Sequence, residues 1–232
     1  MAHSTQAAEP QHVLTGEPGR HHEAELAHHF DSVEQQTEVT TLGMWVFLVT
    51  EILFFGGLFT AYMVYRSLNP HAFAQGSHHL DVLLGGINTA VLIMSSLTMA
   101  LAVRAAQLED RGTLRAMLFF TILLGFTFLG IKAVEYTDKF LHHLVPGPHF
   151  HFEGAVSRAV EIFYSLYFVM TGLHAAHMVI GAAMMILLFV QSGRHAFTGR
   201  FKSRVEIFGL YWHFVDIVWI FLFPLLYLLG RH

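Results

Sequence analysis

One stretch of the chain, residues 42–65, reads LGMWVFLVTEILFFGGLFTAYMVY and carries a single charged side chain, Glu51, near its middle. About 20 apolar residues let an α-helix cross a bilayer, so the stretch predicts a membrane-spanning helix. An ionised carboxylate on its apolar face costs at least about 2.5 kcal/mol. Glu51 is therefore expected to be protonated or paired with a group on another helix. We treat it as a candidate functional residue; the alternative is a structural hydrogen bond between helices.

The composition of the chain is typical of an integral membrane protein. Of its 232 residues, 54% are hydrophobic and 13% are charged, whereas soluble domains carry about 25% charged residues. The chain has no cysteine, which excludes disulfides, thiolate ligands and thiol nucleophiles. No cleaved signal peptide is expected, because no basic region with a short apolar run begins the chain. We expect no nucleic-acid partner.

Five apolar segments predict an all-α, polytopic membrane protein. The third uncharged run, 116–131, is short, and its flanking Arg115 and Lys132 are expected to snorkel to the interfaces. Pro224 in the last segment predicts a local kink, because proline lacks a backbone donor. The predicted transmembrane helices lie near residues 41–67, 81–106, 113–141, 159–191 and 204–230.

Residues 1–40 form a separate region, a polar tail before the transmembrane domain of residues 41–232. The tail is acidic, with seven acids against one arginine, and it holds six histidines. Such a composition cannot bury enough apolar surface to fold alone, so we expect a mostly flexible, solvated tail whose last part packs on a neighbour. The alternative is a metal-binding histidine tract.

The basic residues of the loops predict an orientation. The loops between the second and third and between the fourth and fifth segments hold seven Lys and Arg residues, against five on the other side. This bias predicts a cytoplasmic N-terminus and an outward C-terminus. The five are Arg66, Lys132, Lys139, Arg158 and Arg231. For the outward histidines we expect a solvated surface, with a metal site as the alternative; they are His71, His78, His79, His142, His143, His149 and His151.

Ionisable side chains recur at one depth of the predicted membrane. Glu51 and Asp216 each lie nine residues past the start of an apolar segment, which is about 13 Å along a helix. His174 and His177 straddle the centre of the fourth segment, and His213 lies about one turn from Asp216. Groups this costly are almost always turned inward and paired. We therefore predict one buried polar cluster joining the first, fourth and fifth helices, in which Glu51 ties the first helix to the others.

His174 and His177 are three residues apart, so their rings are expected to point roughly the same way. With Glu51 and Asp216 they could form a di-metal or haem site. Metal sites in helical bundles, however, use a carboxylate near each histidine, as in Glu-x-x-His repeats, and no such repeat occurs in the five apolar segments. We therefore expect no metal and no redox centre in this chain, and we interpret the histidines as hydrogen-bonded to carbonyls, acids or lipid phosphates.

Three motifs resemble the subunit III family of the haem-copper cytochrome c oxidases. They are YWHFVDIVW at residues 211–219, TGLHAAHMVIG at residues 171–181 and TEILFFGGLFTAY at residues 50–62. The similarity extends over residues 28–232 and fits the short, five-helix bacterial form. The segment 156–168 departs from the family pattern, as does the shortened stretch before the last helix. Further positions that match the family are Asn88, Thr89, Glu135, Tyr136, Trp212 and Trp219.

This resemblance implies a subunit without haem or copper, whose own ligands are phospholipids in a V-shaped cleft. It implies direct packing on subunit I, the catalytic subunit that reduces oxygen and pumps protons, with haem and copper in partner subunits. Further implied partners are subunit II and small subunits or a respiratory supercomplex. The chain would support proton uptake, protect the catalytic subunit during turnover, and lie in the bacterial inner membrane with its C-terminus in the periplasm.

Two consequences concern particular side chains. Glu51 stands at the position of the family's carbodiimide-reactive acid, a reactivity that requires a protonated acid in an apolar site. The aromatic side chains expected to enclose acyl chains are those of Phe54, Phe55, Trp212 and Trp219.

Three other functions remain as alternatives. The first is a similar subunit of a quinol oxidase or nitric oxide reductase complex. The second is an autonomous metal or haem enzyme that uses His174, His177 and His213; the purified chain would then carry a metal or a visible spectrum. The third is a proton-coupled transporter that uses Glu51 and Asp216. Transporters often contain internal repeats with broken helices, and the sequence contains neither.

Overall fold

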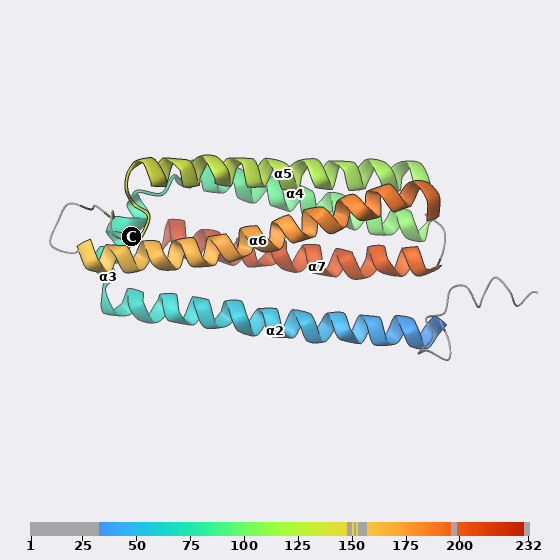
Figure 1. Cartoon of the computed structure of the whole chain (residues 1–232), viewed down its shortest axis with the longest axis horizontal. Coiled ribbons are helices and arrows are strands. Elements are labelled where there is room, and N and C mark those ends of the chain that lie inside the picture. The colour runs from blue at the N-terminus through green and yellow to red at the C-terminus, as the bar shows by residue number, and fades with distance from the viewer. Residues whose placement is uncertain (1–32, 148–149, 151, 153–156, 196–198, 230–232) are drawn as a thin grey trace, which may run out of the picture. The chain divides into compact units, whose positions relative to one another are not determined.

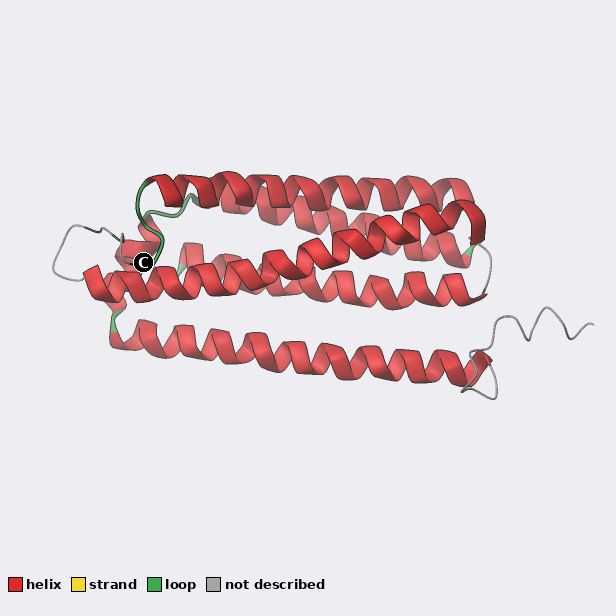
Figure 2. Ribbon diagram, in the orientation of Figure 1, coloured by secondary structure: helices red, strands yellow, loops and turns green. Residues whose placement is uncertain are grey.

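The computed structural model describes residues 33–147, 150, 152, 157–195 and 199–229, and within these ranges the chain is helical and contains no strand (Figure 2). The α-helices are α2 (Val33–Leu68), α3 (Pro70–His78), α4 (Val82–Gln107), α5 (Arg111–Leu141), α6 (Ser157–His195) and α7 (Gly199–Phe223). A π-helical turn, η1 (Pro224–Leu228), follows α7 (Figure 1).

The prediction of five membrane-spanning helices is confirmed by length and apolarity. The candidate spans are Glu38–Leu68, Val82–Gln107, Arg111–Leu141, Arg158–Gly193 and Phe201–Leu228. Pro224 begins the π-helical turn η1, and the kink expected there stays a prediction. The short helix α3 was not predicted, since nine residues of mixed polarity give no span signal.

Aspartates cap two of the spans. Asp81 accepts hydrogen bonds from the backbone N–H groups of Leu83 and Leu84 at the start of α4. Asp110 does the same for α5, accepting from the N–H and hydroxyl of Thr113. These hydrogen bonds lower the pKa of the exposed Asp110 carboxyl. The caps satisfy donors that a helix leaves free at its start, which explains why α4 and α5 begin where they do.

The chain divides into two units, Met1–Thr40 and Thr41–His232. In the first unit, the structure describes residues 33–40, which are helical and form the beginning of α2. Helix α2 therefore begins within the region predicted as the tail. The rest of the predicted tail, with its six histidines, lies outside the described residues, as do His149 and His151.

Four helices of the second unit form a closed ring, because α4 packs on α5, α5 on α6, α6 on α7 and α7 on α4. The ring encloses aromatic side chains, among which Trp212, Trp219 and Phe128 are fully buried. Glycines make room for them. A Cβ atom at Gly125 or Gly181 would lie only 3.2 or 2.8 Å from the indole ring of Trp212. The two positions therefore let α5 and α6 close around α7.

Helix α2 lies outside this ring. Within the described part of the second unit, the backbone of α2 does not approach that of another helix closely. Long side chains connect α2 to the other helices instead. Its end is held by Tyr62, whose ring contacts Phe73 of α3 at a centroid distance of 5.2 Å. Phe73 in turn contacts Phe163 of α6 at 5.5 Å, so α3 joins α2 to the ring.

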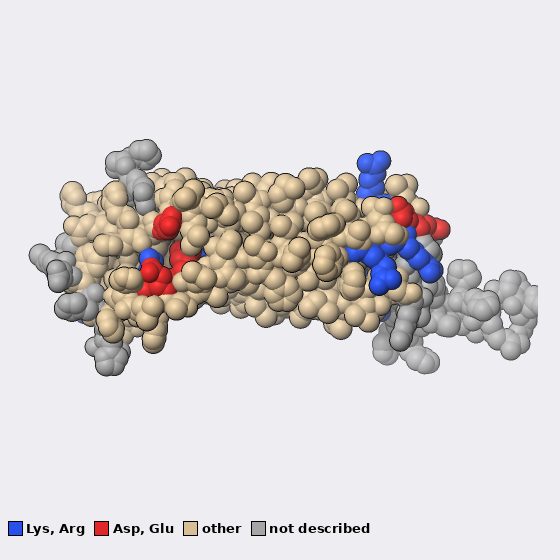
Figure 3. Space-filling model, turned by 90° about the horizontal axis from the view of Figure 1, so that it is seen from above, with Lys and Arg blue, Asp and Glu red and all other residues tan. Residues whose placement is uncertain are grey.

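On the face shown in Figure 3, the charged side chains gather toward the two ends, and the band between them is uncharged. The end where α4 meets α5 and α7 begins is basic. Ion pairing joins Lys202 to Glu109 at 2.5 Å, and Gln107 donates to Glu206 at 2.8 Å. This distribution is the one expected of helices that cross a membrane.

Candidate functional site

Glu51 and His177 meet where α2 passes α6. Oε2 of Glu51 lies 3.1 Å from Nε2 of His177, and the two side chains are only 18% and 17% exposed. This is an ion-pair distance, although Oε2 has no partner that meets hydrogen-bond geometry. Glu51 is thus paired with a group on α6, the fourth of the predicted spans.

A second contact of His177 shows which of its ring nitrogens carries a hydrogen. Nδ1 of His177 lies 2.8 Å from the carbonyl oxygen of Leu173. A carbonyl can only accept, so Nδ1 carries the hydrogen, and Nε2 of a neutral ring is an acceptor. The contact with Glu51 is favourable only if one further proton lies on either the acid or the ring. The pair as a whole is then neutral, which suits its apolar surroundings.

Aromatic side chains enclose the pair. The ring of Phe55 meets the imidazole of His177 edge-on at 5.5 Å, and Phe55 also contacts Phe214 of α7 at 6.4 Å. The hydroxyl of Tyr211 donates to the carbonyl oxygen of His177 at 2.9 Å. Together these contacts fasten α2 to α6 and α7 at mid-helix.

His174 lies elsewhere, in the interior of the four-helix ring. Its side chain is 1% exposed, and neither ring nitrogen has a hydrogen-bond partner within the described residues. The imidazole contacts Phe128 and Trp219 at centroid distances of 5.4 and 5.2 Å. His174 therefore packs as an aromatic ring rather than as a member of a hydrogen-bonded cluster.

His213 and Asp216 face α4. Nδ1 of His213 lies 2.7 Å from the hydroxyl of Ser96. Asp216 is 2% exposed, and neither of its carboxyl oxygens has a hydrogen-bond partner in the described part of the chain. These two residues belong to the seam between α4 and α7.

The prediction of one polar cluster is therefore wrong in its connections. The structure divides the residues into the Glu51–His177 pair, the lone His174 and the His213–Asp216 group. Residues three apart on a helix still differ by about 60° around its axis. That difference is enough to point the His174 side chain into the interior of the four-helix ring and the His177 side chain toward α2.

A buried ion pair in α5 was missed. Lys132 lies 2.9 Å from Glu135, and their side chains are each 4% exposed. Nζ of Lys132 also donates to the hydroxyls of Tyr167 and Tyr227 at 3.2 and 3.1 Å. Both tyrosines in turn donate to Glu135. The expectation that Lys132 snorkels to the interface is therefore wrong, because a carboxylate one turn away and two hydroxyls satisfy its charge inside the ring.

The signal for this group was in the sequence. A lysine and a glutamate three residues apart share a helix face, and here both follow an uncharged run within one span. Rings also surround the ammonium group. Nζ of Lys132 lies 5.1 Å from the ring centroids of both Tyr167 and Trp219, within the range of cation–π attraction.

The other positions matched by the family motifs join helices in the ring interior. Nε1 of Trp219 donates to the hydroxyl of Thr89 at 3.0 Å, and the Tyr136 hydroxyl lies 2.6 Å from that of Thr171. Asn88 donates to the Phe128 carbonyl at 3.5 Å. Trp212 and Trp219 are fully buried, so the expectation that their rings enclose acyl chains is wrong.

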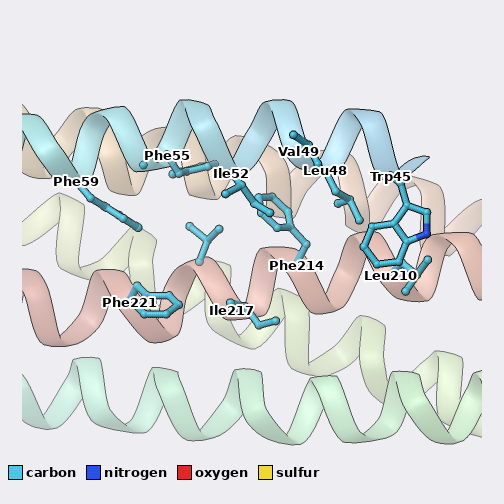
Figure 4. Close-up of a pocket in the computed structure, with 12 residues that line it drawn as sticks. Trp45, Leu48, Val49, Ile52, Phe55, Phe59, Leu210, Phe214, Ile217 and Phe221 are labelled. Carbon is cyan, nitrogen blue, oxygen red and sulfur yellow. The ribbon is translucent and has the colours of Figure 1, made fainter. Parts of the chain in front are cut away.

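An apolar groove of about 450 Å³ lies between α2 and α7, and we call it the α2–α7 groove. Figure 4 shows the side chains of α2 directed toward α7 across this space. Apart from the indole N–H of Trp45, its lining side chains have no polar atom. They include Trp45, Leu48, Ile52, Phe55, Phe59, Phe214, Ile217 and Phe221.

Metal ligands do not gather in the part of the chain that the structure describes. No three His, Asp or Glu side chains there lie close enough together to hold a metal ion. His174 and His177 in particular point to different surroundings.

Comparison with known proteins gives one consistent result. The family model described as "Cytochrome c oxidase subunit III" matches residues 21–231. The chain is 35% identical to "Cytochrome c oxidase subunit 3" of Synechocystis sp. over 83% of its own length and 76% of the relative. It is 35% identical to the protein of the same name from Corynebacterium diphtheriae, over 82% and 87% of the two chains. It is also 28% identical to "Probable quinol oxidase subunit 3" of Staphylococcus epidermidis, over 88% and 96%.

Proposed function

The chain belongs to the cytochrome c oxidase subunit III family and is a subunit III of a haem-copper oxidase, and from this premise we propose that it acts by holding phospholipid beside the catalytic subunit. In this proposal the chain has no redox centre of its own. It packs directly on subunit I, which carries the haem and copper centres together with subunit II, and it sustains proton uptake by subunit I during turnover.

The observation that supports this proposal is the α2–α7 groove. Its volume of about 450 Å³ and its apolar lining suit hydrocarbon chains. A dry cavity of this size would lose dispersion contacts on both of its walls. Side chains such as those of Ile52 and Phe221 are 57% and 60% exposed there, and acyl chains would supply the missing contacts.

The Glu51–His177 pair has a structural role in this proposal. It is the polar contact that ties α2 to α6 beside the groove, and it sets how far α2 stands from α7. We propose no place for it on the main pumping route, because no hydrogen bond links it to His174 or to Asp216 among the described residues.

Two neighbouring glycines provide a matched test. Gly56 lines the α2–α7 groove, whereas Gly57 does not, and a Cβ atom at either position would meet nothing within 4 Å. Gly56→Phe should fill the groove and displace an acyl chain, whereas Gly57→Phe should not. The measurement is native mass spectrometry of the intact complex, with the number of turnovers before inactivation as the second readout.

We expect Gly56→Phe to reduce the bound phospholipid and to shorten the active lifetime, while Gly57→Phe leaves both unchanged. Equal lipid content in the two variants would contradict the proposed lipid site. Stoichiometric haem, copper or iron in the separated subunit would contradict the absence of a redox centre.

We further propose that the protein lies in a bacterial inner membrane with its N-terminus in the cytoplasm. Two of the five basic residues counted on the outward side are buried. Lys132 pairs with Glu135 as described, and Lys139 is bound to Asp138 and to the carbonyl oxygen of His79. Removing these two from the count of loop charges strengthens the bias toward a cytoplasmic end at the α4–α5 and α6–α7 connections.

The electron donor of the complex is either cytochrome c or a quinol, because relatives from both kinds of oxidase resemble the chain. We propose cytochrome c, because the two relatives named cytochrome c oxidase subunit 3 are 35% identical to the chain, whereas the quinol oxidase relative is 28% identical. Oxygen consumption by the purified complex with reduced cytochrome c and with a quinol tests this choice directly, and activity with the quinol alone would overturn it.

A further inference from the structure

A second cavity, of about 260 Å³, lies on the other side of α7, in the seam with α4; we call it the α4–α7 groove. Ser96 of α4 and His213 and Asp216 of α7 line it, together with apolar side chains such as Ile93 and Leu97. Both helices contribute their middle residues, so the polar groups lie deep in the membrane-spanning region.

Asp216 makes this groove unusual. The side chain is 2% exposed, yet neither oxygen has a hydrogen-bond partner within the described residues. The nearby Ser96 hydroxyl is engaged with Nδ1 of His213 at 2.7 Å. The Ser96 hydroxyl has a single hydrogen, so at least one carboxyl oxygen of Asp216 is left without a partner in a place where an unsatisfied polar group is costly.

The missing partner must carry a polar hydrogen-bonding group, either a donor to the carboxyl oxygens or an acceptor for the O–H of the protonated acid. A lipid acyl chain has none, so acyl chains in this groove would leave the carboxyl group as it is. A transmembrane helix satisfies its own backbone and can offer a polar side chain, that of Ser, Thr, Asn, Gln, Trp or a basic residue. Polar side chains of this kind join helices in membranes.

We propose that the α4–α7 groove is the docking surface for a transmembrane helix of a partner oxidase subunit, which presents a polar hydrogen-bonding side chain to Asp216. This proposal rests on the proposed function, since it requires the chain to be assembled in an oxidase. It assigns Asp216 to assembly and leaves the exposed apolar side chains around it to pack against the same helix.

The two grooves of α7 differ in the property that decides their occupants. Ile217 lines both, so they adjoin across one exposed strip of α7. The α2–α7 groove has no carboxyl, hydroxyl or imidazole group in its lining, whereas the α4–α7 groove has all three. Lipid therefore suits the first and a protein helix the second, which provides an internal control.

Photo-crosslinking in the intact complex tests the assignment. A photoreactive phenylalanine analogue would replace Leu97, which is 52% exposed in the α4–α7 groove, or Ile52, which is 57% exposed in the α2–α7 groove. We expect an adduct with another oxidase subunit at position 97 and a lipid adduct at position 52. Tandem mass spectrometry would identify the crosslinked residue of the partner, which should lie within one helical turn of a polar side chain.

Variants of Asp216 give the second measurement. Asp216→Asn keeps an acceptor and adds a donor, so the chain should stay in the purified complex. Asp216→Leu removes the polar partner, and retention of the chain during detergent purification should fall about tenfold.

The outcomes separate this proposal from the proposed function. If position 97 gives only lipid adducts, or only adducts with a second copy of this chain, while the chain still co-purifies with the catalytic subunits, the docking surface is refuted and the function stands. Equal retention of Asp216→Leu and the unmodified chain would also refute it. If the chain does not co-purify with an oxidase, both proposals fail.

Discussion

The proton of the Glu51–His177 pair leads to the first prediction. Because Nδ1 of His177 donates to Leu173, Nε2 can accept a hydrogen bond from an amide as well as from a protonated acid. In the Glu51→Gln variant the complex should therefore assemble and retain most of its initial rate of oxygen reduction. Carbodiimide labelling of the chain should disappear, because the amide offers no acid to react.

Glu51→Ala is the contrasting variant. It leaves the imidazole of His177 without its partner in a mostly buried site, at a cost of about 1–3 kcal/mol. The chain should then be lost more readily from the complex in detergent. If Glu51→Gln instead assembled fully but no longer pumped protons, the acid would be a proton relay, and the structural role proposed for it would be wrong.

The second prediction at this scale concerns Lys132. Lys132→Met would leave Glu135 buried beside two tyrosine hydroxyls without its cation. Removing one partner of a buried ion pair costs about 3–5 kcal/mol. Thermal unfolding of the complex should therefore begin at a lower temperature, and the double variant Lys132→Met/Glu135→Leu should recover much of the loss.

The control for Lys132 is Lys202→Met. Lys202 pairs with Glu109 near the surface, where the two side chains are 26% and 59% exposed, and such pairs contribute about 1 kcal/mol or less. Equal effects of the two methionine variants would show that the buried pair has no special role.

The contrast between Glu51 and Lys132 explains how much of the site the sequence predicts. An isolated charge in an apolar run, such as Glu51, can be recognised from the sequence alone. Its pairing with a group on another span follows from the cost of burying it. The identity of the partner does not follow, since it depends on where α2 stands relative to α6. Lys132 was misassigned because a lysine near the end of an apolar run has two solutions, snorkelling and internal pairing, and only the tertiary position of Tyr167 and Tyr227 decides between them.

At the scale of the helices, the packing of α6 on α7 depends on Gly181. A methyl group there would lie 2.8 Å from Cζ3 of Trp212, and Trp212 is fully buried with its indole N–H bound to Ser95 at 3.0 Å. The ring cannot move without losing that bond. Gly181→Ala should therefore destabilise the chain by about 1–3 kcal/mol, measured as the midpoint of thermal unfolding.

Gly130 supplies the matched control on α5. A Cβ atom at this position would meet nothing within 4 Å, and alanine favours a helix over glycine by about 1 kcal/mol. Gly130→Ala should be neutral or slightly stabilising. If both alanine variants behaved alike, the close approach of Trp212 to α6 would not limit the packing.

The helices themselves were the most predictable part of the molecule. Hydropathy over a bilayer-length window depends only on composition, so all five spans follow from the sequence. The closed ring of α4–α7 does not follow, because it depends on small residues opposite large ones, as at Gly125 and Gly181 against Trp212. Helix α3 could not be predicted from the sequence either, because what holds it in place is a tertiary contact: Phe73 is buried between two other aromatic rings.

At the scale of the whole molecule, the absence of cysteine makes orientation directly measurable. A single cysteine introduced into an otherwise unchanged chain can be labelled by a thiol reagent that does not cross the membrane. The useful positions are Gly112 at the basic end, whose Cβ would meet only the Asp110 carboxyl at 3.4 Å, and His142 at the other end, which is 66% exposed.

We expect His142→Cys to be labelled in intact cells, and Gly112→Cys to be labelled only after the membrane is opened. The physical reason is the bias in loop charge. The cations Arg104, Arg111 and Arg115 are exposed near the α4–α5 connection, whereas Lys132 and Lys139 are buried in ion pairs and do not act as loop charges. Labelling of Gly112→Cys in intact cells would reverse the orientation. The helices would then cross the membrane in the opposite direction, and the capped starts of α4 and α5 would each lie on the side opposite to the one proposed.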